Sequence, residues 1–169
     1  MQASPDKALE QAAKAQKARE KAASLYPNET WGELEDHIFI ARAREPKSNN
    51  QKRDLEKELV QSRILTAMGS TVYLLPEVGA SKHPDAVVDG FIMEFKTITG
   101  NADRVEDHYR SSRKKADRIF FKINSDLSPE SVLRKLIDRI RKGNHSGGLI
   151  IAHFTHTNKT YFWEEDRLK

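Results

Sequence analysis

The dipeptide Asp89-Gly90, which lies between two short apolar runs, constrains this chain more than any other feature of its sequence. A two-residue type I′ turn needs positive φ at both central positions, and Asp-Gly meets that requirement at low cost. We therefore predict that the runs 86–88 and 91–98 are antiparallel strands joined by this turn. Because the turn has two residues, it also fixes the register of the hairpin.

That register brings two carboxylates face to face. Counting outward from the turn places Asp85 opposite Glu94 and His83 opposite Lys96. Side chains alternate along a strand, so Asp85, Glu94 and Lys96 share one face. Carboxylates directly opposite each other repel and destabilise the pair. A divalent cation, the ammonium of Lys96 or plain solvent exposure would offset that repulsion, and a solvated face with an ordinary Glu–Lys pair is the structural alternative.

The remaining pattern predicts an α/β (α+β) domain in which helices flank a central mixed β-sheet. Helices are expected over 51–68, 101–115 and 129–142, and strands over 71–75, 86–88, 91–98, 118–123, 149–153 and 160–163. The Ala-rich start has Leu9 as its single large apolar residue, which predicts a solvated helix. We expect an N-terminal helical extension and linker over 1–48 and the functional domain over 49–169.

Positive charge is concentrated in one part of the chain. The sequence has 29 Lys+Arg against 25 Asp+Glu, and residues 104–142 hold twelve basic and six acidic side chains. Localised basicity favours a nucleic-acid partner bound through its phosphates, although solvated helical faces would also explain it. The candidate contacts are His83, Arg110, Arg113, Lys114 and Lys115.

Two classes of function are excluded by composition. The chain has no cysteine, which rules out disulfides, Cys-ligated zinc, iron–sulfur clusters and thiol catalysis. Its apolar runs are too short to span a membrane, so stable membrane association of this domain is not expected.

The sequence around the turn resembles a known nuclease signature. Pro84-Asp85 followed by Glu94-Phe95-Lys96, with a helix before and a helix and strand after, resembles the PD-(D/E)xK nuclease superfamily. A longer set over about 51–164 resembles the C-terminal tRNase domains of CdiA-type contact-dependent growth inhibition toxins. That set comprises Glu58-Leu59-Val60, Val72-Tyr73-Leu74-Leu75-Pro76-Glu77, Pro84-Asp85-Ala86, Asp89-Gly90, Glu94-Phe95-Lys96-Thr97 and Thr99-Gly100-Asn101.

The resemblance implies a restriction-endonuclease-like core, and it implies roles for individual residues. Asp85 and Glu94 would be metal ligands and Lys96 the catalytic lysine. An acidic residue of the first helix would complete the set, and Glu58 is our choice because it lies between Leu55 and Leu65 on that helix. Glu77 is a weaker candidate. The expected cofactor is Mg²⁺ or Mn²⁺, with Zn²⁺ as a further option.

The resemblance also implies a biological setting. The domain would hydrolyse a phosphodiester of tRNA, and a dedicated immunity protein, expected to be acidic, would neutralise it. It would be secreted or delivered from the cell surface as the C-terminal part of a larger protein and would act in the cytoplasm of the target cell.

Other functions fit parts of the same sequence. His153 and His156, near the end of a predicted strand, could serve a metal-independent ribonuclease as general acid and base. A DNA endonuclease of the same fold is a second alternative. A non-catalytic nucleic-acid-binding module is a third, which explains the basic helices but gives no reason for opposed carboxylates beside a lysine.

Overall fold

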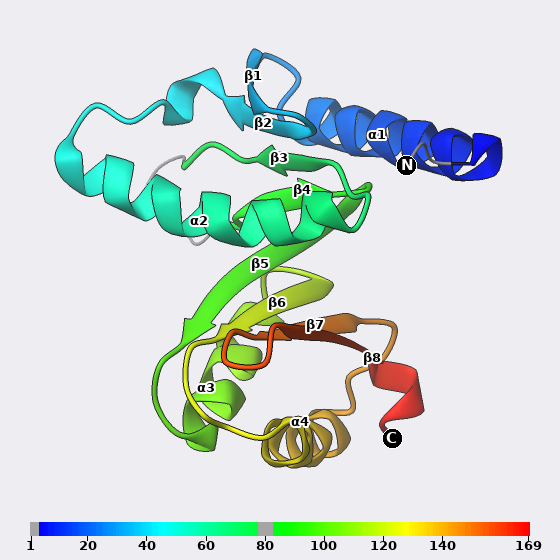
Figure 1. Ribbon diagram of the computed structural model, residues 1–169, viewed down its shortest axis with the longest axis vertical. Helices are drawn as coiled ribbons and strands as arrows, with labels where there is room; N and C mark the ends of the chain where they lie inside the picture. Colours follow the sequence, from blue (N-terminus) through cyan, green and yellow to red (C-terminus); the bar gives the residue numbers. More distant parts are fainter. Residues whose placement is uncertain (1–3, 78–82) are drawn as a thin grey trace. The chain divides into compact units, whose positions relative to one another are not determined.

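The computed structural model describes residues 4–77 and 83–169 (Figure 1). The chain divides into two compact units, Met1–Ile92 and Met93–Lys169. Each unit has helices packed against its own strands, and in each the strands run in mixed directions. The predicted α+β class, with a mixed sheet flanked by helices, is confirmed. The predicted boundary between residues 48 and 49 stays a prediction.

The first unit is built on four short strands in the order β1-β2-β3-β4. Strands β1 and β2 are antiparallel, β2 and β3 are parallel, and β3 and β4 are antiparallel. Ser4 and Ser48 cap the two helices, since their hydroxyls accept from the main-chain nitrogens of Lys7 and Gln51. The elements are α1 (Pro5–Leu25), β1 (Trp31–Glu35), β2 (Ile38–Ala41), the 3₁₀ helix η1 (Arg42–Arg44), α2 (Asn49–Ala67), β3 (Val72–Leu74) and β4 (Ala86–Val88).

Helix α1 departs from the sequence-based expectation. Leu9 is 70% exposed, as a solvated helix requires, but Ala18 and Ala22 are fully buried and pack with Tyr73 and Val87. The prediction that this helix stays off the core is therefore wrong for its second half. Two alanines one turn apart let the helix backbone approach the strands closely, so docking here needs no stripe of large apolar residues.

The turn after β4 has the predicted backbone. Asp89 has φ of 54° and Gly90 has φ of 96°, both in the left-handed region. The Asp89 carboxylate accepts from Ser70 Oγ at 2.8 Å and from the Thr71 nitrogen at 2.9 Å. The turn is thereby fastened to the start of β3. The register predicted beyond the turn, with Asp85 opposite Glu94, stays a prediction.

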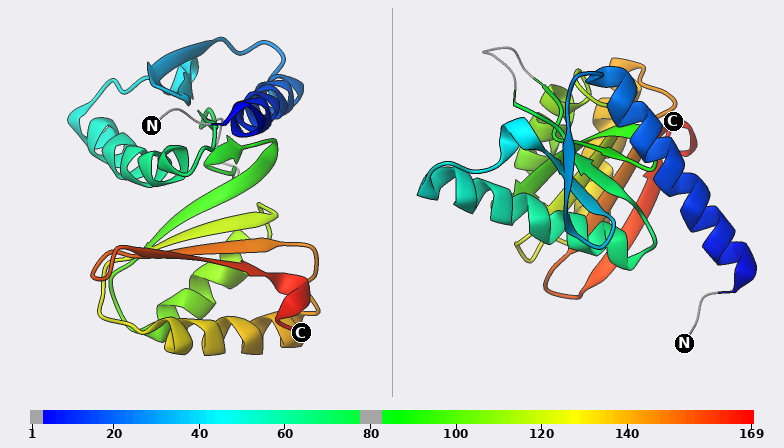
Figure 2. Two further views of the ribbon diagram at one scale, coloured as in Figure 1. Left: turned by 45° about the vertical axis from the view of Figure 1, so that its right-hand side comes forward. Right: turned by 90° about the horizontal axis from the view of Figure 1, so that it is seen from above.

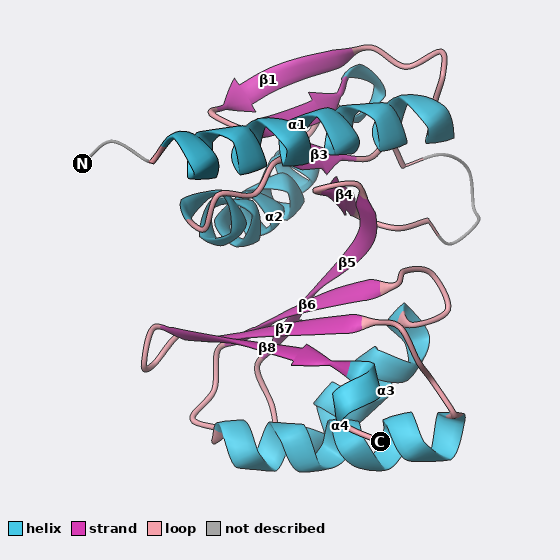
Figure 3. Ribbon diagram, turned by 90° about the vertical axis from the view of Figure 1, so that its right-hand side faces the viewer, coloured by secondary structure: helices cyan, strands magenta, loops and turns pink. Residues whose placement is uncertain are grey.

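The second unit stacks two helices against one face of its strands (Figures 2 and 3). Strands β5, β6 and β7 are parallel neighbours, and β8 is antiparallel to β7. The buried core includes Val105, Tyr109, Leu136, Phe121 and Phe154. The elements are β5 (Phe91–Ile98, whose first two residues belong to the first unit), α3 (Ala102–Ser112), β6 (Arg118–Ile123), α4 (Pro129–Gly143), β7 (Leu149–Phe154), β8 (Lys159–Glu164) and the 3₁₀ helix η2 (Glu165–Arg167).

Among the helices of residues 4–77 and 83–169, none has both the length and the apolar character needed to cross a bilayer.

Candidate functional site

Arg44, at the end of η1, is the centre of a buried polar cluster in the first unit. Its side chain is only 9% exposed. Nη2 is bound to the carboxylate of Glu58 and lies 3.5 Å from Oε1 of Glu77. Nη1 donates to the main-chain oxygens of Leu75 at 3.3 Å and Asp85 at 3.4 Å. One guanidinium therefore joins residues from three separate segments.

Glu58 and Asp85, both predicted metal ligands, meet in this cluster. Glu58 lies on α2 with its side chain 13% exposed, so it faces inward as the helical wheel predicts. The side chain of Asp85 also acts to lower the pKa of Glu58, which shows that the two side chains lie close together. Burial raises the pKa of Glu58, and the guanidinium of Arg44 opposes that effect. The structure thus brings together two of the predicted acidic residues, with Glu77 close by on the same arginine.

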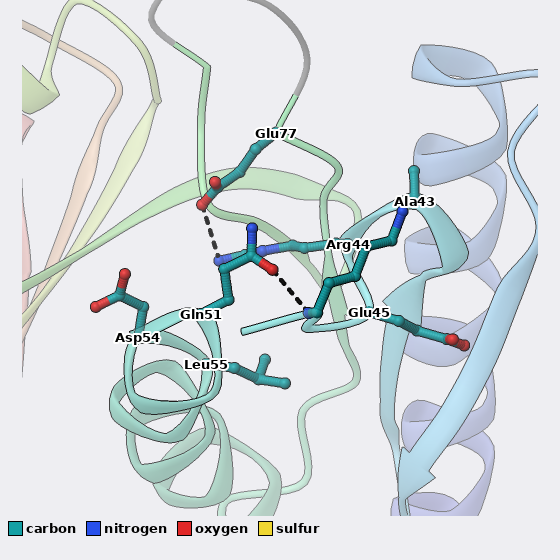
Figure 4. A pocket seen from close by; sticks show the side chains of 8 residues that line it. Ala43, Arg44, Glu45, Gln51, Asp54, Leu55 and Glu77 are labelled. Carbon is teal, nitrogen blue, oxygen red and sulfur yellow. Dashed lines mark hydrogen bonds and ion pairs between the residues drawn. The ribbon is translucent and has the colours of Figure 1, made fainter. Parts of the chain in front are cut away.

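A cavity opens beside this cluster (Figure 4). Glu77 reaches across it to Arg44, and the amide oxygen of Gln51 accepts from the Lys47 nitrogen at 2.7 Å. Its volume is about 180 Å³, and its charged lining residues are Arg44, Glu45, Lys47, Asp54 and Glu77. Arg44 and Glu77 are the members of the cluster that line this cavity.

Glu94, in the second unit, is buried rather than solvated. Only 1% of the residue is exposed. Nζ of Lys115, just beyond α3, lies 2.8 Å from Oε2 of Glu94. The alternative of a solvated carboxylate is therefore wrong for Glu94. A buried carboxylate keeps its charge at neutral pH only with a cation or hydrogen-bond donors beside it.

Lys96, two residues further along β5, is half-buried and belongs to a positively charged region. Burial lowers the pKa of His108, and the nearby cations Lys96 and Arg104 lower it further. A polar cavity of about 270 Å³ is lined by Arg104 and His108 together with Thr97 and Thr99. Lys96 and Arg104 thus bring positive charge close to His108, and Asp107 opposes their effect.

The predicted nucleic-acid contacts have different environments. Arg110 and Lys114 are exposed on or near α3, where phosphates can reach them. Arg113 is instead bound to the buried carboxylate of Glu165, and Lys115 to Glu94. His83 is half-buried and lies just before β4. Their roles in binding stay predictions.

The histidines of the alternative ribonuclease differ in exposure. His153 is 7% exposed in β7, and its Nδ1 lies 2.8 Å from the hydroxyl oxygen of Thr160. Burial and the charge of Lys122 lower its pKa. His156 is exposed in the turn that follows. The environment of His153 is that of a packed strand residue with a hydroxyl partner.

The carboxylates suit a hard divalent ion in chemistry, because Mg²⁺ and Mn²⁺ take oxygen ligands. Two of these carboxylates already face a side-chain cation. Glu58 is paired with Arg44, and Glu94 is paired with Lys115. Within residues 4–77 and 83–169, no group of three or more His, Asp or Glu side chains is spaced to hold a metal ion. The carboxylates therefore suit a divalent ion by the type of their donor atoms. In the structure, the cation beside Glu58 is the guanidinium of Arg44.

The sequence does not predict the role of Arg44 or the pairing of Lys115 with Glu94. Arg44 follows a short strand in a segment interpreted as a linker, and nothing in its neighbours marks it as buried. Lys115 was considered for phosphate binding, and its contact with Glu94 depends on the packing of α3 beside β5, which spacing alone does not give.

Comparison with known proteins places the chain in a family. A family model described as "Contact-dependent growth inhibition CdiA C-terminal domain" matches residues 82–167. The chain belongs to that family. The matched segment of this CdiA C-terminal domain contains Asp85, Glu94 and Lys96, whereas Arg44 and Glu58 precede it.

A solved structure has a similar fold. It is described as "CdiA-CT/CdiI toxin and immunity complex from Burkholderia pseudomallei". It shares 22% sequence identity with this CdiA C-terminal domain at a TM-score of 0.50, and the match covers 71% of this chain and 92% of that chain. At this identity the likeness concerns the fold. A search of curated proteins found no match.

Proposed function

We propose that this CdiA C-terminal domain is a toxin that cleaves tRNA as a metal-dependent endoribonuclease of the PD-(D/E)xK type. The observation that carries the proposal is the state of the predicted acidic residues. Glu58 is bound to the buried Arg44, which also donates to the main-chain oxygen of Asp85, and Glu94 is buried against a lysine. Burying a carboxylate costs free energy even when a cation lies beside it. Several buried carboxylates among the residues of the predicted site therefore favour a functional explanation.

Each residue of the motif has a proposed role. Asp85, Glu94 and Glu58 would hold Mg²⁺ or Mn²⁺, and Zn²⁺ would be the third option. A bound ion of this kind supplies Lewis-acid chemistry and lowers the pKa of a coordinated water. Lys96 would orient the attacking water or neutralise charge on the phosphate. The predicted register of the Asp89-Gly90 turn is what joins Asp85 to Glu94 in this proposal.

The substrate would be held through its phosphates. Arg110 and Lys114 have the exposure this requires, and His83, Arg113 and Lys115 remain candidates. Binding through phosphates releases counterions, so the affinity for RNA should fall steeply with salt. Choice of tRNA over other RNA rests on the family resemblance.

An immunity protein is the proposed partner. The solved structure of similar fold is a complex of a toxin with its immunity protein, which supports a partner of that kind here. Because the RNA-binding face would be basic, an acidic surface would bind it best. The domain would be delivered as part of a larger protein and would act in the cytoplasm of the target cell.

The test is a cleavage assay on the full chain. Total tRNA and plasmid DNA are each incubated with Mg²⁺, Mn²⁺, Zn²⁺ or EDTA. We expect cleavage of tRNA that depends on the ion, and a rate loss of at least about a hundredfold in Asp85→Ala, Glu94→Ala and Lys96→Ala. The matched control is Glu56→Ala, an exposed acid on the same helix as Glu58.

Four outcomes would overturn the proposal in different ways. Wild-type rates in the three variants would show that the motif is not the active site. Cleavage that persists in EDTA would favour the histidine-based ribonuclease, and cleavage of plasmid alone would make the domain a DNA endonuclease. Binding without cleavage under every ion would leave a nucleic-acid-binding module.

A further inference from the structure

Arg44 is the cation that connects the acidic residues of the first unit in this structure. Glu58 reaches it from α2, while Leu75 and Glu77 come from the segment after β3 and Asp85 from the residue before β4. A lysine could satisfy one of these acceptors at a time. A guanidinium satisfies several because its planar fork presents five donors in fixed directions.

The charges in this cluster do not balance. The guanidinium of Arg44 feels three carboxyl groups, those of Glu58, Glu77 and Asp85. Arg44 and Glu58 are largely withdrawn from water, so their charges are weakly screened, whereas the Glu77 side chain is 64% exposed and its charge is screened by solvent. Because one guanidinium serves several carboxyl groups, the cluster has the capacity to accept further positive charge.

We propose that Arg44 is a positioning residue that pre-assembles Glu58 and Asp85, and that its guanidinium competes with a divalent ion for Glu58. This inference rests on the metal ligands of the proposed function and adds a residue outside the family signature. The physical reason is that a guanidinium and a divalent ion repel each other and seek the same carboxylate oxygens.

Competition gives a clear expectation for metal affinity. In Arg44→Gln the repelling charge is gone, so the full chain should bind Mn²⁺ at least about fivefold more tightly by titration calorimetry. Arg44→Lys keeps the charge and loses the fork, so its affinity should stay closer to that of the wild type. Without metal, Arg44→Gln should melt at a lower temperature than the wild type. Mn²⁺ should then raise the melting temperature of Arg44→Gln by more than it raises that of the wild type.

The matched control is Arg63→Gln. Arg63 also lies on the first unit and pairs with two acids, Glu35 and Glu56, but it is exposed and outside the cluster. Its replacement should leave the Mn²⁺ affinity unchanged. In a Glu58→Gln background, the effect of Arg44→Gln on affinity should disappear, because the shared carboxylate is gone.

The results separate this inference from the proposed function. Equal or weaker Mn²⁺ binding by Arg44→Gln, with tRNA cleavage still dependent on metal, overturns the role of Arg44 alone. Tighter binding by Arg44→Gln in a chain that cleaves no nucleic acid supports Arg44 and overturns the nuclease. An absence of Mn²⁺ binding in every variant overturns both. If Arg44→Gln does not fold, Arg44→Lys with and without Glu58→Gln gives the same comparison.

Discussion

Nζ of Lys115 lies 2.8 Å from Oε2 of Glu94, which ties the segment just after α3 to the middle of β5. The Glu94 side chain is 2% exposed and the Lys115 side chain 20% exposed. Lys115 therefore stabilises the second unit by pairing with a buried carboxylate. A role in substrate binding would come in addition.

Replacing Lys115 by methionine should lower the free energy of unfolding by about 3 kcal/mol, because a buried carboxylate loses its ammonium. Urea unfolding followed by circular dichroism measures the loss. The exposed neighbour Lys114→Met is the control and should change stability by less than about 0.5 kcal/mol. The double variant Glu94→Gln with Lys115→Met should be more stable than Lys115→Met alone, and strict additivity would contradict the pairing.

The carboxylate of Glu165 fastens η2 to the core of the second unit. It accepts from the hydroxyl of Tyr109, from Nε of Arg113 at 3.1 Å and from the nitrogen of Gly148 at 2.7 Å. We expect Glu165→Ala to cost about 3 kcal/mol and Tyr109→Phe about 1 kcal/mol of unfolding free energy. Glu164, which is exposed, provides the control substitution Glu164→Ala. If this variant lost as much unfolding free energy as Glu165→Ala, the hydrogen bonds of Glu165 would not be the cause of the loss.

Gly148 has no room for a side chain. A Cβ there would collide with the Glu165 carboxylate and lie 2.8 Å from the main-chain oxygen of Asp117. Gly148→Ala should therefore destabilise the protein by about 2 kcal/mol in thermal or urea unfolding. Gly32→Ala, where a Cβ meets nothing within 4 Å, should be close to neutral. Equal effects of the two substitutions would be the contrary result.

The free energy of unfolding should decrease as the pH is lowered, because of His153. Burial and Lys122 lower its pKa in the folded protein, whereas the unfolded histidine titrates near pH ~6.5. Its neutral form contributes fully above about pH 6.5, and that contribution is lost as the pH falls towards the folded pKa, because the unfolded state then binds more protons. Urea unfolding between about pH 7.5 and 5 should show a shallower dependence in His153→Gln. The exposed His156→Gln should keep the wild-type slope.

Local signals in the sequence were sufficient for several elements. Asp89-Gly90 predicted a turn with positive φ because few other residue pairs adopt that backbone at low cost. Helix α4 follows from the Ser128-Pro129 start, where the serine hydroxyl accepts from the Ser131 nitrogen. These elements depend on residues within a few positions of one another.

Elements that depend on distant residues were missed. Strands β1 and β2 lie in a segment read as a linker, because β2 is fixed by parallel pairing with β3 across the whole of α2. Arg44 is buried by that same pairing and by acids 14 to 41 residues away. Of the candidate site, Glu58 and Asp85 meet as carboxyl partners, and the role of each residue in catalysis stays a prediction.

The seating of α1 on Ala18 and Ala22 has a consequence for local opening. Small side chains give close contact but little buried apolar area, so few contacts resist detachment of this helix from Tyr73 and Val87. Amide hydrogens of α1 should therefore exchange with deuterium through a low-energy excursion that leaves the strands protected. The first unit then behaves as a stable sheet with a separable helix, and proteolysis in the native state should begin along Pro5–Leu25.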